Sequence, residues 1–356
     1  MMNSLISSFI QFFLALQIPV FFTLFLFILF SFFWLPIFKF FKLIKYNNLQ
    51  KVHEDETARL GGSLIYLFLI LCFLFGLLDD FLIKSIIISS IPIVLVSFKE
   101  DLFHDTSPKI RLLSMILSCA IFFIFVDINF PSIEFPFLNN LFSEDYFNFI
   151  FYTFALIVLM NGMNLIDGLN GLFGFTALFQ LLSLIFLSYS VNDFEMINVL
   201  FIPLIPLIIF LFFNFPSGKI FAGDFGAYLF GFINGILTIY FFGKHPYLMS
   251  WLAVLILFYP CYELLFSYIR KIRINISPLD ADDQHLHTLF YRYLNDILKI
   301  KKSNSFATLL LAIFWLTPFL FTFILFNNVI IVILLIISLS VIYIMLYKYL
   351  KAKRGN

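Results

Sequence analysis

The chain has 356 residues, of which 62% are apolar and only 12% are charged, and its formal net charge is +1. Soluble domains are nearer half apolar and a quarter charged, so this composition excludes a soluble cytosolic enzyme, a disordered chain and a secreted soluble product. A transmembrane helix needs about 20 apolar residues, so the composition has room for about 11 spans. The three cysteines all lie inside apolar runs, which argues against a disulfide framework.

Apolar runs of about spanning length follow one another along the chain, separated by short polar segments. Backbone groups inside lipid must be hydrogen-bonded within their own segment, and the alternation typical of barrel strands is missing from the sequence. We therefore predict an all-α, polytopic integral membrane protein with about 11 transmembrane helices and no cleaved signal peptide. The expected spans are 12–38, 62–78, 82–98, 110–127, 147–160, 171–190, 194–213, 225–242, 247–268, 305–325 and 328–347.

The distribution of lysine and arginine orients these spans. An odd number of crossings places the two termini on opposite sides, and basic residues accumulate in cytoplasmic segments. With the basic C-terminal tail inside, every lysine and arginine except Lys84 and Lys244 is cytoplasmic, and the net charge divides into about +7 inside and −6 outside. We expect the N-terminus outside and the C-terminus in the cytoplasm, in a single membrane domain, 1–356.

The sequence predicts the local structure of three polar segments between the spans. The outer segment 128–146 is too rich in proline for a helix, so we expect a turn or a short hairpin. The cytoplasmic loop 269–304 is expected to include an amphipathic helix at the membrane surface. The acidic pair Asp79-Asp80 falls in an outer loop, away from the other polar clusters, and is interpreted as an ordinary loop.

The first two candidate clusters lie on inner segments that flank the early spans. Arg59 precedes Gly61-Gly62, where paired glycines at a helix start can bring backbone amides to an anion or simply form a tight turn. Glu100 and Asp101 end a span, where adjacent carboxylates persist mainly if they bind a cation or accept a proton. A solvated helix end is the alternative interpretation, and Lys109 follows in the same segment.

A third cluster places Asn161, Asn164 and Asp167 at intervals of three residues, which puts them on one face of a helix. Gly168 and Gly171 then break the helix and expose backbone amides. Three polar groups between two apolar spans are costly unless they line a hydrated site. Hydrogen bonding between helices would explain one asparagine but not the whole array.

The last two clusters follow in the same order along the chain. Asp224 stands between Gly223 and Gly226 at the entrance of a span, where it can cap the helix or leave room for a hydrated Mg²⁺ that carries a phosphate. His285 and His287 are two residues apart. No further ligand stands at zinc-finger spacing, so contact with a phosphate or a sugar is favoured over zinc.

Together, the five clusters resemble the polyprenyl-phosphate N-acetylhexosamine-1-phosphate transferase family, known as bacterial glycosyltransferase family 4 and related to phospho-N-acetylmuramoyl-pentapeptide transferase. The motif-bearing region is 51–292. Its most specific pieces are Asn161-x-x-Asn164-x-x-Asp167-Gly168-x-x-Gly171-Leu172 and Gly223-Asp224-x-Gly226.

The resemblance implies that a cytosolic UDP-N-acetylhexosamine delivers its sugar 1-phosphate to a polyprenyl phosphate, with undecaprenyl phosphate as the expected lipid. The products are a polyprenyl-diphosphate sugar and UMP, at the start of a cell-surface polysaccharide such as the O-antigen of lipopolysaccharide. Mg²⁺ is the implied cofactor, with Mn²⁺ as the alternative ion. The active site would face the cytoplasm from the inner membrane of a bacterium. The lipid bilayer is a further partner, a homodimer is compatible with the pattern, and no nucleic acid is expected.

The resemblance also implies roles for individual residues. Glu100 and Asp101 match the family's acidic pair, with Asp101 orienting or deprotonating the lipid phosphate. Asp224 matches the main Mg²⁺ ligand, and Asp167 is a second catalytic and metal-binding carboxylate. The implied substrate contacts are Asn161, Asn164, Asn170, Lys109, Arg59, His285 and His287.

Several positions depart from the family pattern. Glu100 replaces the first aspartate of the acidic pair, Asn170 stands where many members have a second aspartate, and Thr288 replaces the last histidine of a His-x-His-His pattern. These changes leave open a divergent or inactive member of the family.

Two other classes of membrane protein compete with this interpretation. A secondary transporter would place ionisable residues at mid-membrane, often in two related halves. A CDP-alcohol phosphotransferase would carry an Asp-Gly-x-x-Ala-Arg signature, whereas Asp167-Gly168 continues here as Leu-Asn-Gly-Leu. The placement of the acids at one interface and the lack of a visible internal repeat disfavour the transporter, and the missing signature disfavours the CDP-alcohol phosphotransferase.

Overall fold

The computed structural model describes residues 17, 19–26, 28, 59–75, 81–131, 139–142, 144–278, 280, 282–325 and 328–354. All regular elements within these ranges are helices, as expected. Most of the first expected span, 12–38, and the pair Asp79-Asp80 lie outside the described residues.

Every expected span after the first coincides with a helix or with consecutive helices. In chain order these are α3 (Gly61–Leu74), α4 (Phe81–Ser89), α5 (Ile91–Phe103), α6 (Pro108–Phe125), α7 (Asn139–Phe142), α8 (Asp145–Ile166), α9 (Leu172–Ser190), α10 (Phe194–Asn214), α11 (Gly223–Lys244), α12 (Trp251–Ile256), α13 (Phe258–Arg273), α14 (Leu286–Arg292), the π-helix η2 (Tyr293–Ile297), α15 (Ser303–Leu310), α16 (Ala312–Trp315), α17 (Thr317–Leu325) and α18 (Val329–Arg354).

Six of the described helices, α6, α8, α9, α10, α11 and α18, are long and apolar enough to cross a membrane. The count rises to eight if α4 with α5, bent by 45°, and α15 with the helices after it, bent by 41°, each form one span. The chain is therefore a multi-pass helical membrane protein. The predicted number of 11 spans is not confirmed, because α3 has only 14 residues and α13 ends in a basic turn. The orientation of the termini also stays a prediction.

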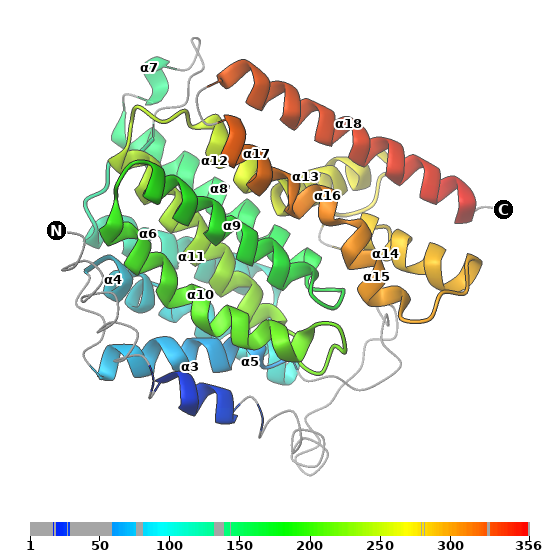
Figure 1. Cartoon of the computed structure of the whole chain (residues 1–356), viewed down its shortest axis with the longest axis horizontal. Coiled ribbons are helices and arrows are strands. Elements are labelled where there is room, and N and C mark those ends of the chain that lie inside the picture. Colours follow the sequence, from blue (N-terminus) through cyan, green and yellow to red (C-terminus); the bar gives the residue numbers. More distant parts are fainter. Residues whose placement is uncertain are drawn as a thin grey trace.

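Both polar segments for which a loop structure was predicted, 128–146 and 269–304, contain short helices. Within 128–146, residues 139–142 form the one-turn helix α7 and α8 begins at Asp145, whereas residues 132–138 and 143 lie outside the described ranges. In the segment 269–304, α14 runs directly into the π-helix η2. Figure 1 shows α14 and α15 together at the right-hand end of the molecule, where α18 also ends.

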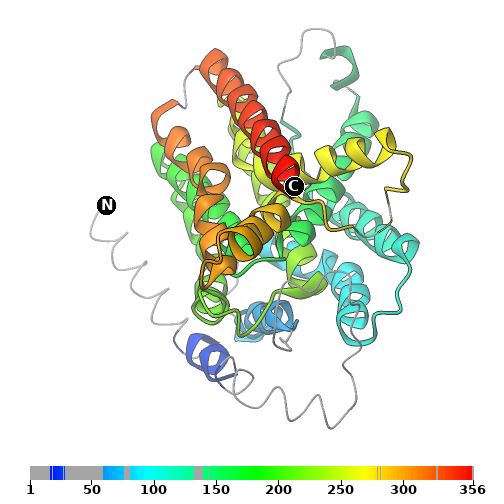
Figure 2. The ribbon, with the colours of Figure 1, turned by 90° about the vertical axis from the view of Figure 1, so that its right-hand side faces the viewer.

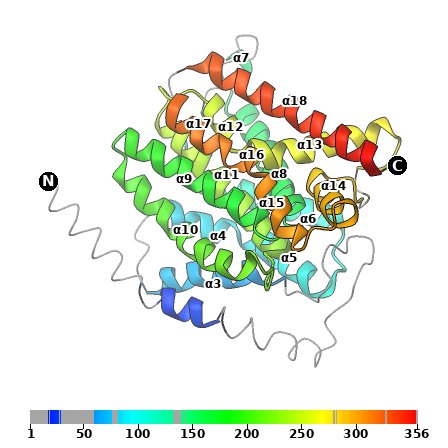
Figure 3. The ribbon, with the colours of Figure 1, turned by 45° about the vertical axis from the view of Figure 1, so that its right-hand side comes forward.

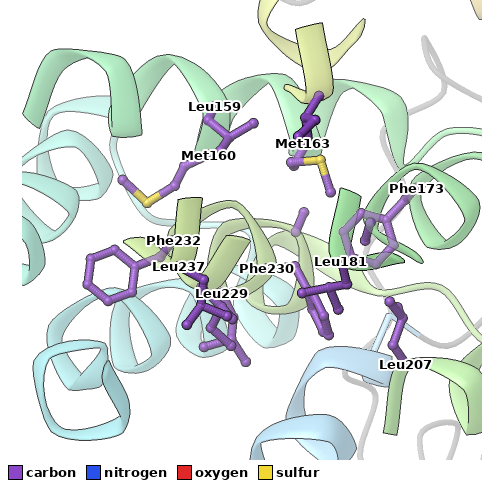
Figure 4. Close-up of a cluster of buried hydrophobic side chains, with 14 of the residues drawn as sticks. Leu159, Met160, Met163, Phe173, Leu181, Leu207, Leu229, Phe230, Phe232 and Leu237 are labelled. Atoms are coloured by element: carbon purple, nitrogen blue, oxygen red, sulfur yellow. The ribbon is translucent and has the colours of Figure 1, made fainter. Parts of the chain in front are cut away.

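Helix α11 is the central element of the fold. In the most apolar 18-residue stretch of each helix, 94% of the residues are buried in α11, compared with 17% in α18 and 28% in α6. Helix α11 is therefore surrounded by protein, whereas α18 and α6 expose broad apolar faces. It packs against α3, α5, α8 and α9, and Figure 3 shows it among these helices. In Figure 4, side chains of α11 such as Phe230 and Phe232 meet Met160 and Met163 of α8 and Phe173 of α9.

Glycines let neighbouring helices approach α11 at the end that carries the polar clusters. A Cβ on Gly62 would lie 2.1 Å from the backbone nitrogen of Gly226, so only glycine fits at this contact between α3 and α11. Helices α3, α9 and α11 begin at this end, and α5, α8 and α10 finish there, because consecutive spans run antiparallel. Figure 2 looks onto the molecule from the side on which α14 and α15 lie. The ends of the apolar helices thus bring the predicted polar segments together.

We predict that Gly62→Ala destabilises the protein by about 1–3 kcal/mol, because the added methyl group overlaps the backbone of α11 and cannot be absorbed by a side-chain rotation. The buried thiols of Cys72 and Cys119 permit the measurement, since a thiol-reactive dye reports their exposure during thermal unfolding in detergent. Leu113→Ala, on the exposed face of α6, is the control. Equal melting temperatures for the two variants would contradict the close approach of α3 and α11.

Candidate functional site

The N-terminus of α11 is held by two carboxylates from other helices. Asp101, near the end of α5, accepts the backbone N–H groups of Asp224 (2.8 Å) and Phe225 (2.9 Å). Asp167, at the end of α8, accepts the N–H of Gly223 (2.9 Å). The first amides of a helix have no partner within the helix and carry partial positive charge. Asp101 and Asp167 therefore supply the helix cap that the sequence before α11 lacks.

Gly223 is required by this arrangement. Its φ is +73°, and a Cβ there would lie 2.6 Å from a carboxylate oxygen of Asp101 and 2.4 Å from the backbone oxygen of Arg59. The N–H groups of Gly61 and Gly62 donate to the carbonyls of Phe221 (2.9 Å) and Ala222 (3.0 Å). The paired glycines thus bind the chain segment before α11, and their amides are not directed at an anion site.

The carboxylate of Asp224 lies in the middle of the cluster. One oxygen contacts the guanidinium of Arg111 at 2.9 Å, and the other accepts the side-chain N–H of Asn164 at 2.8 Å. Arg111 also lies 3.5 Å from the hydroxyl of Tyr228 and 4.0 Å from Glu100. The side chain of Asp224 is 13% exposed and that of Arg111 is 25% exposed, so the pair remains accessible to a ligand.

Arg111 received no role from the sequence, although it stands only two residues after Lys109. The pattern of α6 contains the signal: Ser114 and Met115, three and four residues further on, are buried, so Arg111 lies on the inward face. Lys109 is on the exposed surface. The helical register therefore points to Arg111 as the cation of this segment that meets the carboxylates.

Glu100 and Arg59 lie at the edge of the cluster. Glu100 accepts the backbone N–H of Thr106 (2.8 Å), which closes the turn between α5 and α6. Arg59 is exposed, and its positive charge opposes the rise that burial causes in the pKa of Asp167. The structure thus places both residues beside the helix α11 cap, with Glu100 engaged mainly in the turn.

The array of Asn161, Asn164 and Asp167 is only partly brought together. Asn164 and Asp167 face the start of α11. Asn161 donates instead to the carbonyl of Ile157 (2.8 Å) in its own helix and lies 3.4 Å from the sulfur of Met115.

Asn170 is part of the scaffold in this structure. Its side-chain N–H donates to the carbonyl of Pro216 (2.8 Å), and its backbone is bonded to Asn304 (2.7 Å) and Thr308 (2.8 Å) on α15. An aspartate could not donate the first of these bonds. The departure from the family pattern at this position is therefore matched by the local hydrogen bonding.

The two histidines stack on each other beside the same loop. Their rings are 5.6 Å apart and 8° from parallel. A Cβ on Gly168 would lie 2.9 Å from Nε2 of His287, which places His287 against the residue that follows Asp167. His285 is turned the other way, towards the buried Glu263 of α13.

Burial raises the pKa of Asp167 to about 7, against the opposing effects of the Gly223 hydrogen bond and the charge of Arg59.

Carboxyl groups outnumber guanidinium groups in this cluster, since Glu100, Asp101, Asp167 and Asp224 lie around Arg111 and Arg59. Mg²⁺ is commonly bound by one or two carboxylates together with substrate phosphates, so Asp224 and Asp167 fit such an ion. Within the described ranges, no group of three or more His, Cys, Asp or Glu side chains forms a closed metal cage.

We predict that His287 makes stability depend on pH. Burial lowers the pKa of its imidazole to about 4 from the ordinary 6.5. Below about pH 6.5 the unfolded chain binds a proton that the folded chain rejects, so up to about 3 kcal/mol is lost as the pH falls towards 4. His287→Gln should remove this part of the pH dependence. Thermal unfolding of both proteins between about pH 4 and 7 tests it, and parallel curves would refute it.

Comparison with known proteins identifies the family. Residues 62–242 match the sequence profile described as glycosyl transferase family 4. The chain is 24% identical over 241 residues to the probable undecaprenyl-phosphate N-acetylglucosaminyl 1-phosphate transferase of Bacillus subtilis, covering 67% of this chain and 66% of that protein, just under two thirds of its length.

Two further relatives carry the name undecaprenyl-phosphate alpha-N-acetylglucosaminyl 1-phosphate transferase. The protein of Thermotoga maritima is 26% identical over 245 residues, 68% of this chain and 71% of its own length. That of Salmonella typhi is 24% identical over 257 residues, 70% and 69%. The profile match spans half of the chain and includes the Asp101, Asp167 and Asp224 segments, which confirms the resemblance: the chain belongs to glycosyl transferase family 4.

Proposed function

We propose that the protein transfers an N-acetylhexosamine 1-phosphate from a UDP-sugar to undecaprenyl phosphate, producing undecaprenyl-diphosphate sugar and UMP. In the net reaction the sugar-linked phosphorus loses its anhydride bond to UMP and gains a bond to an oxygen of the lipid phosphate. The observation that carries this proposal is the cluster of Asp101, Asp167, Asp224 and Arg111 at the N-terminus of α11. The names of the relatives support the choice of lipid and of N-acetylglucosamine as the first sugar to test.

The position of the cluster suits one lipid substrate and one water-soluble substrate. It lies where α8 ends and α9 and α11 begin, so it is at the ends of apolar helices and not at their middles. A transporter would need its ionisable groups near mid-membrane. The positive-inside rule predicts that this end faces the cytoplasm, where UDP-sugars are made. The bacterial relatives support a location in the bacterial inner membrane.

The roles follow from the contacts. Asp224, with Asp167 beside it, would hold Mg²⁺, which supplies positive charge to the phosphates of both substrates. Arg111 neutralises Asp224 and lies near enough to bind a phosphate oxygen, because its guanidinium is partly exposed. Phosphoryl transfer depends mainly on such positioning and charge neutralisation. Asn164 fixes the orientation of the Asp224 carboxylate.

Asp101 has a different task from a freely available base. Both of its oxygens accept backbone N–H groups, so it fixes the start of α11 and thereby Asp224. The role expected from the family resemblance, deprotonating or orienting the lipid phosphate, stays a prediction. It requires Asp101 to give up one of these two bonds when the lipid binds.

The direct test supplies purified protein in detergent with Mg²⁺, undecaprenyl phosphate and a panel of UDP-sugars, and measures UMP release. We expect UMP from at least one UDP-N-acetylhexosamine, and only when the lipid phosphate is present. A folded protein that releases no UMP from any sugar would refute the transferase and leave an inactive family member. Lipid-independent UMP release would indicate hydrolysis of the nucleotide sugar.

Asp224→Asn should lower kcat by at least about 100-fold, because the site loses the charge that holds the cation and the partner of Arg111. The matched control is Asp193→Asn, which removes a buried carboxylate at the opposite end of α9 and α10. Its activity per folded molecule should stay within about twofold of the wild type. Similar losses in both variants would mean that the α11 cluster has no special part in turnover.

A further inference from the structure

Glu263 on α13 is fully buried and lies outside the carboxylate cluster around α11. One of its oxygens accepts from Nδ1 of His285 (3.2 Å) and from the backbone N–H of Leu286 (3.3 Å). A buried carboxylate is costly unless it is paired and hydrogen-bonded. The contacts with His285 and Leu286 offset that cost and attach the start of α14 to α13.

His285 has a carboxylate at each ring nitrogen. Its Nε2 lies 3.3 Å from Asp282, whose carboxylate is in turn held by Arg270 at 2.7 Å. Its ring cannot rotate without breaking one of these two contacts. The two carboxylates therefore hold His285 in a single ring orientation.

The orientation of His285 is passed on to the candidate site. The ring of His287 stacks on it in parallel, and Nε2 of His287 faces Gly168. Gly168 directly follows Asp167, which holds the N–H of Gly223. His287 is 4% exposed, and its Nδ1 is buried without a hydrogen-bond partner, so the ring is held by packing and stacking.

Helix α13 is itself fixed on α8 close to the site. A Cβ on Gly162 would lie 2.2 Å from the carbonyl oxygen of Pro260, so the two backbones touch two residues before Asn164. Tyr259 and, from α18, Tyr343 are fully buried in electrostatic contact with Glu263. Glu263 is therefore held in place by the packing of α13 on α8 and by the buried tyrosine of α18.

We propose that Glu263 is a positioning residue for the nucleotide-sugar side of the site: it fixes His285, and through the stacked rings it holds His287 against the Asp167–Gly168 turn. The proposal rests on the proposed function for its kinetic consequence, because His287 is then the group beside the diphosphate of the UDP-sugar. It concerns residues outside the segment 62–242 that matches the family profile.

The geometry can be tested without activity. The chain has five histidines, so ¹³C-histidine NMR in detergent gives few signals, and His285→Gln and His287→Gln assign two of them. Glu263→Gln should shift both of these signals. Asp193→Asn is the matched control, because Asp193 is also a buried carboxylate bound to an imidazole, Nε2 of His245, at 2.8 Å. It lies beyond the C-terminal end of α9, a helix about 28 Å long that begins beside the candidate site, and should move only the His245 signal. Unchanged His285 and His287 signals in Glu263→Gln would overturn the proposal.

The kinetic test separates positioning from stability. Glu263→Gln should raise KM for the UDP-sugar by about 10- to 100-fold, the loss of one hydrogen bond to a charged group, and leave KM for undecaprenyl phosphate unchanged. Glu263→Asp, which keeps the charge, should recover part of the loss and also serves if the glutamine variant does not fold. Asp193→Asn should lower the melting temperature without changing either KM.

The possible outcomes distinguish the two proposals. If the wild type releases no UMP, the proposed function fails, and the NMR comparison still decides whether Glu263 orders the histidines. If the wild type is active and both Glu263 variants keep the wild-type KM for the UDP-sugar, the positioning role is wrong although the transferase stands.

Discussion

The hydrogen bonds between two carboxylates and the first amides of α11 are the constraint on which the site depends. Asp101 and Asp167 satisfy N–H groups that would otherwise be buried without partners, and the partial positive charge of the helix end offsets the repulsion among the acids. Their position places Asp224, in the first turn of the same helix, within reach of Arg111 and Asn164. Stability and chemistry therefore share the same few contacts.

Much of this arrangement could be predicted from the sequence. The apolar runs located every described helix of spanning length, because backbone groups in lipid leave no alternative to a helix. The distribution of charge predicted that the acidic and asparagine segments lie at one end of the spans, and Asp167 and Asn164 do meet the start of α11 there. The five polar clusters taken together predicted the family, which the profile match over residues 62–242 confirms.

The remainder depends on tertiary contacts that the sequence does not encode locally. Spacing of three residues put Asn161 on the same face as Asn164, yet only Asn164 reaches α11, because Asn161 bonds back to its own helix. The sequence predicted Asn170 as a substrate contact, whereas in the structure its side-chain amide donates to the carbonyl of Pro216. The sequence pointed to Lys109 and not to Arg111, because choosing between them requires knowing which face of α6 is buried. The glycine pair at α3 packs on backbone and does not present amides to a ligand.

The caps of α11 have a consequence for how this protein matures in the membrane. Asp101 and its amide partners are separated by more than 120 residues along the chain, and Asp167 is 56 residues from Gly223. Because translation proceeds from the N-terminus, α5 and α8 are synthesised before α11, so Asp101 and Asp167 have no amides of α11 to accept from until that helix is made. The last helix to arrive in this group is also the most enclosed. The site is therefore complete only after the glycine-containing helix α11 has packed between helices that were synthesised before it.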